Sequence, residues 1–266
     1  MSSVDRDRQT LELVLDARGP VRVRFGVDDE GRRRNRLEVH GRAWAEQHGI
    51  RVPRIVAHDP DGAWLVSEDA AGGDPTGHEF VDAALDVADR IAAADPLTSA
   101  EAPSSWRASR RGTARRAARI WRAGITPYRF VDERRQAQAL PPEVPVHGDL
   151  YEGNVLYTGH GPATIIDWEH AGRGPRHADA IRLITTVRRS EDAEYGLERL
   201  LREAPRSSWP SITVQVRWLS LRHYVDHFAG GSDDPLPAAE VDGARRRWQR
   251  AVEWADDIDE ARRRPS

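Results

Sequence analysis

The sequence predicts an α+β protein with a small β-rich N-terminal lobe and a larger helical C-terminal lobe. Short runs rich in β-branched residues, bounded by turn residues, occupy the first 70 positions. From residue 79 onward, long segments repeat apolar residues at helical spacing instead. We therefore expect an N-terminal lobe over residues 1–70 and a C-terminal lobe over residues 71–266, a length that suits a two-lobed unit.

Four strands and one helix are expected in the N-terminal lobe. The strands are predicted at residues 10–15, 20–25, 52–59 and 63–69, with the first two forming a hairpin. Between the two pairs, residues 37–49 have a helical pattern that ends at Gly49. Residues 27–35, which precede this helix, are interpreted as a loop.

The rest of the chain is expected to be mostly helical. A glycine-rich segment, residues 70–77, is the predicted hinge between the lobes. Helices are predicted at residues 79–95, 104–124, 178–189, 193–204, 211–229 and 238–264.

Composition excludes several classes of function. No apolar run approaches the roughly 20 residues of a membrane helix, and the polar N-terminus lacks a signal-peptide core, so we expect a cytoplasmic protein with no membrane partner. The absence of cysteine excludes disulfides and thiol catalysis. All 40 basic residues are arginine, which excludes lysine-dependent chemistry, and the net charge of −3 argues against a nucleic-acid partner.

The segment VHGDLYEGNVLYTGHGPATIIDWEHAG carries the strongest functional signal. Its loop holds His147, Asp149 and Asn154, and two short strands then fold Asp167 back beside Asn154. Hard oxygen ligands placed together suit a divalent metal ion that keeps positions for phosphate and water. Asp149 remains to accept a proton from a hydroxyl, which is the arrangement used in kinase-type phosphoryl transfer.

The two motifs in this segment resemble those of the aminoglycoside phosphotransferase and choline kinase-like family, which has the bilobal protein-kinase-like fold. HGDxxxxN and IDWE are present here as HGDLYEGN and IDWE. The resemblance implies that Asp149 orients or deprotonates the acceptor hydroxyl, and that Asn154 and Asp167 hold Mg²⁺ against the phosphates of ATP or GTP. It also implies structural roles for His147, which would brace the loop, and for Asp179 at the start of a helix.

The same resemblance assigns nucleotide contacts to the N-terminal lobe. Arg24 stands where the family has a basic strand residue for the phosphates, with Arg22 as the alternative, and Glu38 is the candidate helix partner. Backbone groups near Ser67 to Asp69 would meet the adenine ring. No glycine-rich turn precedes residue 20, so the lobe is expected to be truncated and a partner protein or peptide could complete it.

We therefore expect a Mg²⁺-dependent kinase that transfers the γ-phosphate of ATP or GTP to a hydroxyl of a small molecule, such as an antibiotic, nucleoside or sugar. Two alternatives remain open: a kinase for Ser or Thr of a natural-product precursor peptide that works with a partner protein, and a non-catalytic kinase-like scaffold. Acidic side chains available for a cationic acceptor are Glu191, Asp192, Glu194, Asp226, Asp233 and Asp234.

Overall fold

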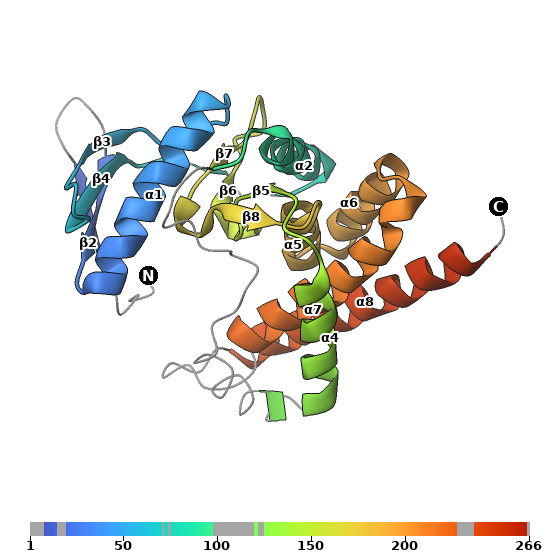
Figure 1. The fold of residues 1–266 in the computed structure, drawn as a ribbon. Coiled ribbons are helices and arrows are strands. Elements are labelled where there is room, and N and C mark those ends of the chain that lie inside the picture. The colour runs from blue at the N-terminus through green and yellow to red at the C-terminus, as the bar shows by residue number, and fades with distance from the viewer. Residues whose placement is uncertain are drawn as a thin grey trace.

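The structure is a computed structural model, and it describes residues 8–14, 20–70, 72–73, 76–97, 120–121, 125–227 and 237–264. A small lobe of strands and one helix lies beside a larger group of helices (Figure 1). The predicted α+β architecture with a small N-terminal lobe is therefore confirmed. The boundary at residue 70 stays a prediction.

The N-terminal lobe contains a four-stranded antiparallel sheet in the order β1-β2-β4-β3. The strands are β1 (Arg8–Val14), β2 (Pro20–Gly26), β3 (Ile55–His58) and β4 (Trp64–Glu68). The predicted hairpin and both later strands are confirmed. Residues 15–19, which join β1 to β2, lie outside the described residues.

The interpretation of residues 27–35 as a loop is wrong, because helix α1 spans Asp29–Gln47. The side chain of Asp28 caps the helix by accepting a hydrogen bond of 2.8 Å from the Gly31 N–H. Glu30 then pairs with Arg33 one turn later. The run of arginines had suggested a solvated loop, but local capping and ion pairs stabilise the first turns of a helix.

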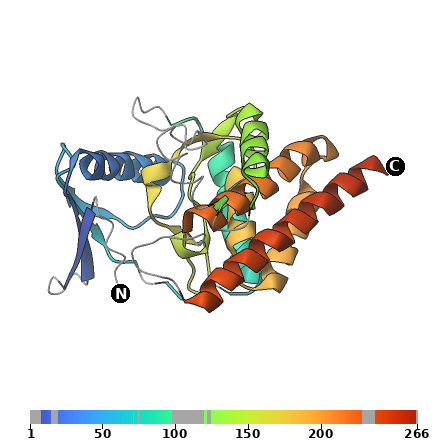
Figure 2. The same cartoon turned by 90° about the horizontal axis from the view of Figure 1, so that it is seen from below.

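Six longer helices build the C-terminal lobe in the described residues. They are α2 (His78–Ala93), α4 (Pro127–Ala139), α5 (Ala178–Thr186), α6 (Ser190–Glu203), α7 (Trp209–His227) and α8 (Ala238–Arg263). Helix α4, which the sequence reading did not include, begins with proline in its first turn. Most of the predicted helix at 104–124 lies outside the described residues. Helix α8 runs alongside α7 (Figures 1 and 2).

Two small antiparallel pairs lie between the lobes and carry the central motif. Strand β5 (Val144–Val146) pairs with β8 (Gly172–Gly174), and β6 (Val155–Leu156) pairs with β7 (Thr164–Ile165). The short 3₁₀ helix η2 (Glu152–Asn154) immediately precedes β6, and η3 (Trp168–His170) follows β7. The predicted hairpin between Asn154 and Asp167 is confirmed.

The contact between α1 and η3 joins the two lobes. Trp168 of η3 is fully buried, and its indole N–H donates to the Ile165 carbonyl at 3.1 Å. A Cβ at Gly41 of α1 would lie 2.8 Å from the Trp168 Cβ and 2.9 Å from the Trp168 carbonyl oxygen. Only glycine allows the helix to approach this closely.

Gly41→Ala is therefore expected to lower the free energy of unfolding by about 1–3 kcal/mol, because the new methyl group overpacks the interface. The matched control is Gly243→Ala in α8, where a Cβ would meet only an arginine side-chain end at 3.5 Å. That substitution should be neutral or stabilise the protein by up to about 1 kcal/mol through helix propensity. Urea denaturation of both variants measures the difference; equal effects would contradict the tight interface.

Candidate active site

The catalytic loop, residues 147–154, is held from inside by His147. This side chain is fully buried, and its Nε2 lies 2.9 Å from the Ile166 carbonyl oxygen. Its Nδ1 accepts the Asp149 N–H at 3.3 Å, which places the ring proton on Nε2. The ring also packs edge-on against Trp168, with centroids 4.7 Å apart. The histidine thus connects the loop to the segment that carries Asp167.

Asp179 holds the same loop from helix α5. Its two carboxylate oxygens accept the backbone N–H groups of His147 at 2.6 Å and Gly148 at 3.0 Å. Burial raises the pKa of Asp179, whereas His147 and the two backbone donors oppose that shift. Gly148 has a φ of 80°, a conformation that favours glycine, so the carboxylate meets two consecutive amides of a tight turn.

Replacing Asp179 with alanine should reduce the free energy of unfolding by roughly 2–4 kcal/mol, because two buried N–H groups lose their acceptor. Asp86→Ala is the control, since this exposed carboxylate of α2 pairs only at the surface with Arg199; its cost should stay below about 1 kcal/mol. Thermal and urea unfolding compare the two. A small effect at Asp179 would show that the loop does not depend on this anchor.

The carboxylate of Asp149 faces Arg182, which the sequence reading did not include. One guanidinium nitrogen of Arg182 donates to Asp149 Oδ1, and the Arg182 side chain is almost completely buried whereas that of Asp149 is a quarter exposed. Arg182 lies on α5, three residues after Asp179, so a single helix fixes both the backbone and the carboxylate of the loop.

Arg182 therefore acts as a positioning residue in our interpretation. If Asp149 accepts the hydroxyl proton, as the resemblance implies, Arg182→Gln should lower kcat by roughly 10- to 100-fold through misorientation of Asp149, with a smaller effect on the KM for the nucleotide. Arg182→Lys, which keeps the charge, should recover part of the loss. If the two variants lost the same amount of activity as each other, and both lost thermal stability as well, the role of Arg182 would be purely structural.

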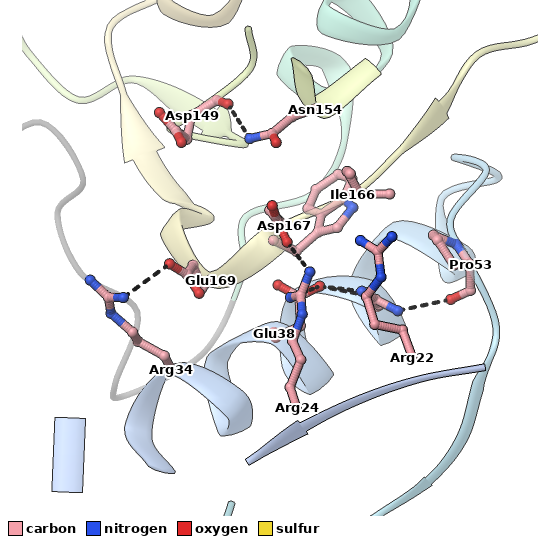
Figure 3. A network of polar contacts seen from close by, with 12 residues as sticks. Arg22, Arg24, Arg34, Glu38, Pro53, Asp149, Asn154, Ile166, Asp167 and Glu169 are labelled. Atoms are coloured by element: carbon pink, nitrogen blue, oxygen red, sulfur yellow. Dashed lines mark hydrogen bonds and ion pairs between the residues drawn. The ribbon is translucent and has the colours of Figure 1, made fainter. Parts of the chain in front are cut away.

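Asn154 and Asp167 present oxygen atoms beside the catalytic loop (Figure 3). The Asn154 amide nitrogen donates to the Asp149 carbonyl at 2.9 Å, so the amide oxygen is the atom left for a metal ion. The Ile166 N–H donates to the Asn154 carbonyl at 3.1 Å and brings the next residue, Asp167, to the same place. Asp167 has a φ of 61°, a left-handed conformation that aspartate tolerates better than most residues.

These donors fit Mg²⁺. The ion is typically held by one or two protein oxygen ligands, with water and phosphate oxygens completing the octahedron. Within the residues that the structure describes, no three His, Asp or Glu side chains gather to hold a metal by themselves. A site of this kind would depend on the nucleotide for its remaining ligands.

Arg24, Glu38 and Asp167 come together at the interface of the lobes (Figure 3). One guanidinium nitrogen of Arg24 donates to Asp167, and another lies 3.6 Å from Glu38 Oε1. Burial alone would lower the pKa of Arg24, but the charges of Glu38 and Asp167 outweigh it and raise the pKa. Glu38 is fully buried and also binds Arg42, with Arg42 Nε 2.6 Å from Oε1. The carboxylate thus joins two arginines.

Part of the segment predicted to contact the adenine ring, Ser67 to Asp69, already makes contacts within the N-terminal lobe. Ser67 is buried within β4. The Asp69 N–H donates to the Pro20 carbonyl at 3.0 Å, and its carboxylate pairs with Arg22 at 3.0 Å. Arg22 therefore points to the hinge side and Arg24 to Asp167. The Asp69 amide is used within the lobe, and contacts of Ser67 and Asp69 with adenine stay predictions.

Two arginines near the site were not predicted from the sequence, although the sequence contains a signal for each of them. Arg42 follows Glu38 by four residues, the spacing of a helical ion pair. Arg182 stands between Ile181 and Leu183 in a segment rich in apolar residues, which indicates a buried charge with a partner. A third link was invisible in the sequence: Arg34 of α1 lies 3.8 Å from Glu169 of η3. Arg34 and Glu169 are far apart in the sequence, so no local pattern predicts this contact.

A family model described as "Phosphotransferase enzyme family" matches residues 3–212. The chain belongs to this phosphotransferase family. No curated protein sequence matches the chain. The predicted resemblance is thereby confirmed at the level of the family.

Solved structures show the same fold at low sequence identity. The amicoumacin kinase hAmiN aligns with a TM-score of 0.61 at 16% identity, covering 95% of this chain and 87% of the other. A choline/ethanolamine kinase family protein from Mesorhizobium loti aligns with a TM-score of 0.59 at 18% identity, covering 96% and 92%. Aminoglycoside phosphotransferase APH(4)-Ia, as a thermostable mutant, has a TM-score of 0.59 at 17% identity, with coverage of 97% and 92%. These likenesses confirm the protein-kinase-like fold.

In the described residues of the present chain, no helix is long and apolar enough to cross a membrane.

Proposed function

We propose that this phosphotransferase moves the γ-phosphate of ATP or GTP to a hydroxyl group of a small molecule, with Mg²⁺ as cofactor. The observation that supports it most is the convergence of Asp149, Asn154 and Asp167, with Arg24 beside Asp167. Two proteins with the same fold were solved with ligands: aminoglycoside phosphotransferase APH(4)-Ia with ADP and hygromycin B, and amicoumacin kinase hAmiN with AMP-PNP, Ca²⁺ and amicoumacin. Those names support a nucleotide and a small-molecule acceptor.

Each residue has a role in this proposal. Asp149 accepts the hydroxyl proton while Arg182 keeps its carboxylate oriented. Asn154 and Asp167 would hold the Mg²⁺ that neutralises phosphate charge. Arg24 contacts the phosphates bidentately and is itself held by Glu38. His147 and Asp179 fix the loop. The chain contributes mainly positioning and electrostatic stabilisation.

Arg24 ties the nucleotide site to the metal site. Its guanidinium bonds to Asp167, the proposed metal ligand. Binding of Mg²⁺ and nucleotide would therefore require Arg24 to exchange Asp167 for phosphate oxygens. Glu38 holds the other side of the guanidinium and remains as its partner through that exchange.

The test is calorimetric titration of the full chain with ATP and then GTP, each with and without Mg²⁺. We expect binding that depends on Mg²⁺ and that identifies the preferred nucleotide. Release of ADP or GDP together with a phosphorylated hydroxyl compound, detected by mass spectrometry, would demonstrate transfer. Absence of binding to either nucleotide would overturn the proposal for the isolated chain.

A further inference from the structure

A cavity of about 410 Å³ opens beside the catalytic loop. Its volume falls within the range of small-molecule sites, roughly 300–1,000 Å³. The catalytic loop, the end of α5 and its following residues, α7 and α8 all contribute to its lining. Its lining includes Tyr151, Glu152, Thr186, Arg188 and Arg247.

Tyr151 connects this cavity to the proposed catalytic groups. It follows Asp149 by two residues and lines the cavity. Elsewhere in the wall, the Thr186 hydroxyl donates to the Arg182 carbonyl at 2.8 Å, and Arg182 in turn binds the Asp149 carboxylate. The cavity therefore adjoins both the loop that carries Asp149 and the helix turn that holds its side chain.

The wall carries more positive than negative charge. Arg188 and Arg247 line it, and Glu152 is the one carboxylate among its lining residues. Glu152 is already compensated, because it accepts the Arg188 N–H at 2.8 Å and lies 3.3 Å from Arg188 Nε. Burial lowers the pKa of Arg247, and the nearby Arg250, Arg188 and Arg246 add to that shift while Glu152 opposes it. Positive charge is thus concentrated where α8 meets the cavity.

Among the acidic residues expected to suit a cationic acceptor, the three described ones, Glu191, Asp192 and Glu194, do not line this cavity. Asp192 is buried and accepts the Gly77 N–H at 2.9 Å, which gives it a structural partner at the start of α2. Glu191 pairs with Arg189. The side chains of Asp226, Asp233 and Asp234 lie outside the described part of the chain. Among the described residues, the wall therefore favours a negatively charged ligand.

We propose that this cavity is the acceptor site and that the acceptor carries an oxyanion group, a carboxylate or a phosphate, in addition to its hydroxyl. The inference rests on the proposed phosphotransferase function. The forked guanidinium of Arg247, aided by Arg188, binds the oxyanion by charge-assisted hydrogen bonds and so orients the hydroxyl toward Asp149. This geometry assigns acceptor selectivity to α8.

The transfer step balances in this arrangement. The acceptor oxygen forms a bond to the γ-phosphorus, and the bond between that phosphorus and the β–γ bridging oxygen breaks. The hydroxyl proton passes to Asp149, and the nucleoside diphosphate leaves with the bridging oxygen. The oxyanion of the acceptor takes no part in bond making. It serves only to bind and orient.

The experiment uses four hexose derivatives of one scaffold that differ in charge: glucose, glucosamine, glucuronate and glucose 6-phosphate. Their binding to the full chain is measured without nucleotide by saturation-transfer NMR, and Mg·ATP binding is measured separately by calorimetry. We expect an anionic member to bind about tenfold more tightly than glucose, since it gains a charge-assisted bond. Glucosamine should bind least. The tighter of the two anions identifies a carboxylate or a phosphate as the preferred group.

Variants of two α8 arginines test whether the preference for an anion arises in this cavity. Arg247→Gln should remove the preference for the anion, whereas Arg247→Lys should retain most of it. Arg264→Gln is the matched control, because this arginine lies at the exposed C-terminal end of the same helix, where it pairs with Glu260. It should bind the anion as the unchanged protein does. An anion that binds Arg247→Gln equally well would overturn the assignment to this cavity.

The possible outcomes distinguish the proposed anionic acceptor from the proposed phosphotransferase function on which it rests. Equal binding of all four hexoses, or tightest binding of glucosamine, would overturn the anionic acceptor even if Mg·ATP binds. Anion binding that depends on Arg247 but occurs in a chain that does not bind Mg·ATP would overturn the phosphotransferase function. The anion site itself would then stand as a binding site.

Discussion

Asp149→Asn is expected to abolish phosphate transfer, with kcat reduced by roughly 10²- to 10⁴-fold, because the amide cannot accept the proton of the acceptor hydroxyl. The substitution keeps the size and shape of the side chain. The backbone anchors of the loop, from Asp179 to His147 and Gly148, are untouched. Asparagine can still accept the hydrogen bond from Arg182 but no longer carries the charge that this nearly buried arginine faces, so thermal stability should fall moderately, whereas Mg·ATP affinity should stay near that of the unchanged protein.

The measurement is the steady-state rate of nucleoside diphosphate release with a phosphorylated acceptor confirmed by mass spectrometry. Asp86→Asn, an exposed carboxylate of α2, serves as the control and should transfer phosphate at the normal rate. Full activity of Asp149→Asn would contradict its role as the proton acceptor. A complete loss of activity without loss of nucleotide binding would instead place the defect in the chemical step.

Asp167→Asn should eliminate the Mg²⁺ dependence of nucleotide binding, with affinity for Mg·ATP reduced by about 100-fold or more, because the proposed metal ligand loses its negative charge. Asparagine is preferred over alanine in this test. Asp167 has a left-handed backbone with a φ of 61°, which asparagine tolerates and alanine does not. A loss of binding can then be attributed to the ligand rather than to the backbone.

Calorimetric titration with ATP, with and without Mg²⁺, distinguishes the outcomes. Unchanged Mg²⁺-dependent binding in Asp167→Asn would remove Asp167 from the metal site. Arg24 provides an internal check, since it loses the charge of its Asp167 partner in this variant but keeps Glu38. The affinity for ATP without Mg²⁺ should therefore fall far less than the affinity for Mg·ATP.

The fold was predictable wherever local chemistry dominates. The hairpin of β1 and β2 and the amphipathic helices α2 and α6 were all expected, because alternation and helical spacing encode them directly. The start of α1 was misjudged, because its first turns contain three arginines and no apolar stripe. There the Asp28 cap and the Glu30 ion pairs favour a helix that hydrophobic spacing does not show.

By itself the sequence determined the family, the α+β class and the three residues proposed for chemistry and metal binding. Asp149, Asn154 and Asp167 lie within 19 positions, so the short hairpin between them sufficed to predict their meeting. The tertiary structure decided what surrounds them. The Arg182 ion pair to Asp149 and the contact between Arg34 and Glu169 join segments 33 and more than 130 positions apart. The arginine-lined cavity likewise draws on α5, α7 and α8, because packing of distant helices, which no local pattern encodes, sets the charge that an acceptor meets.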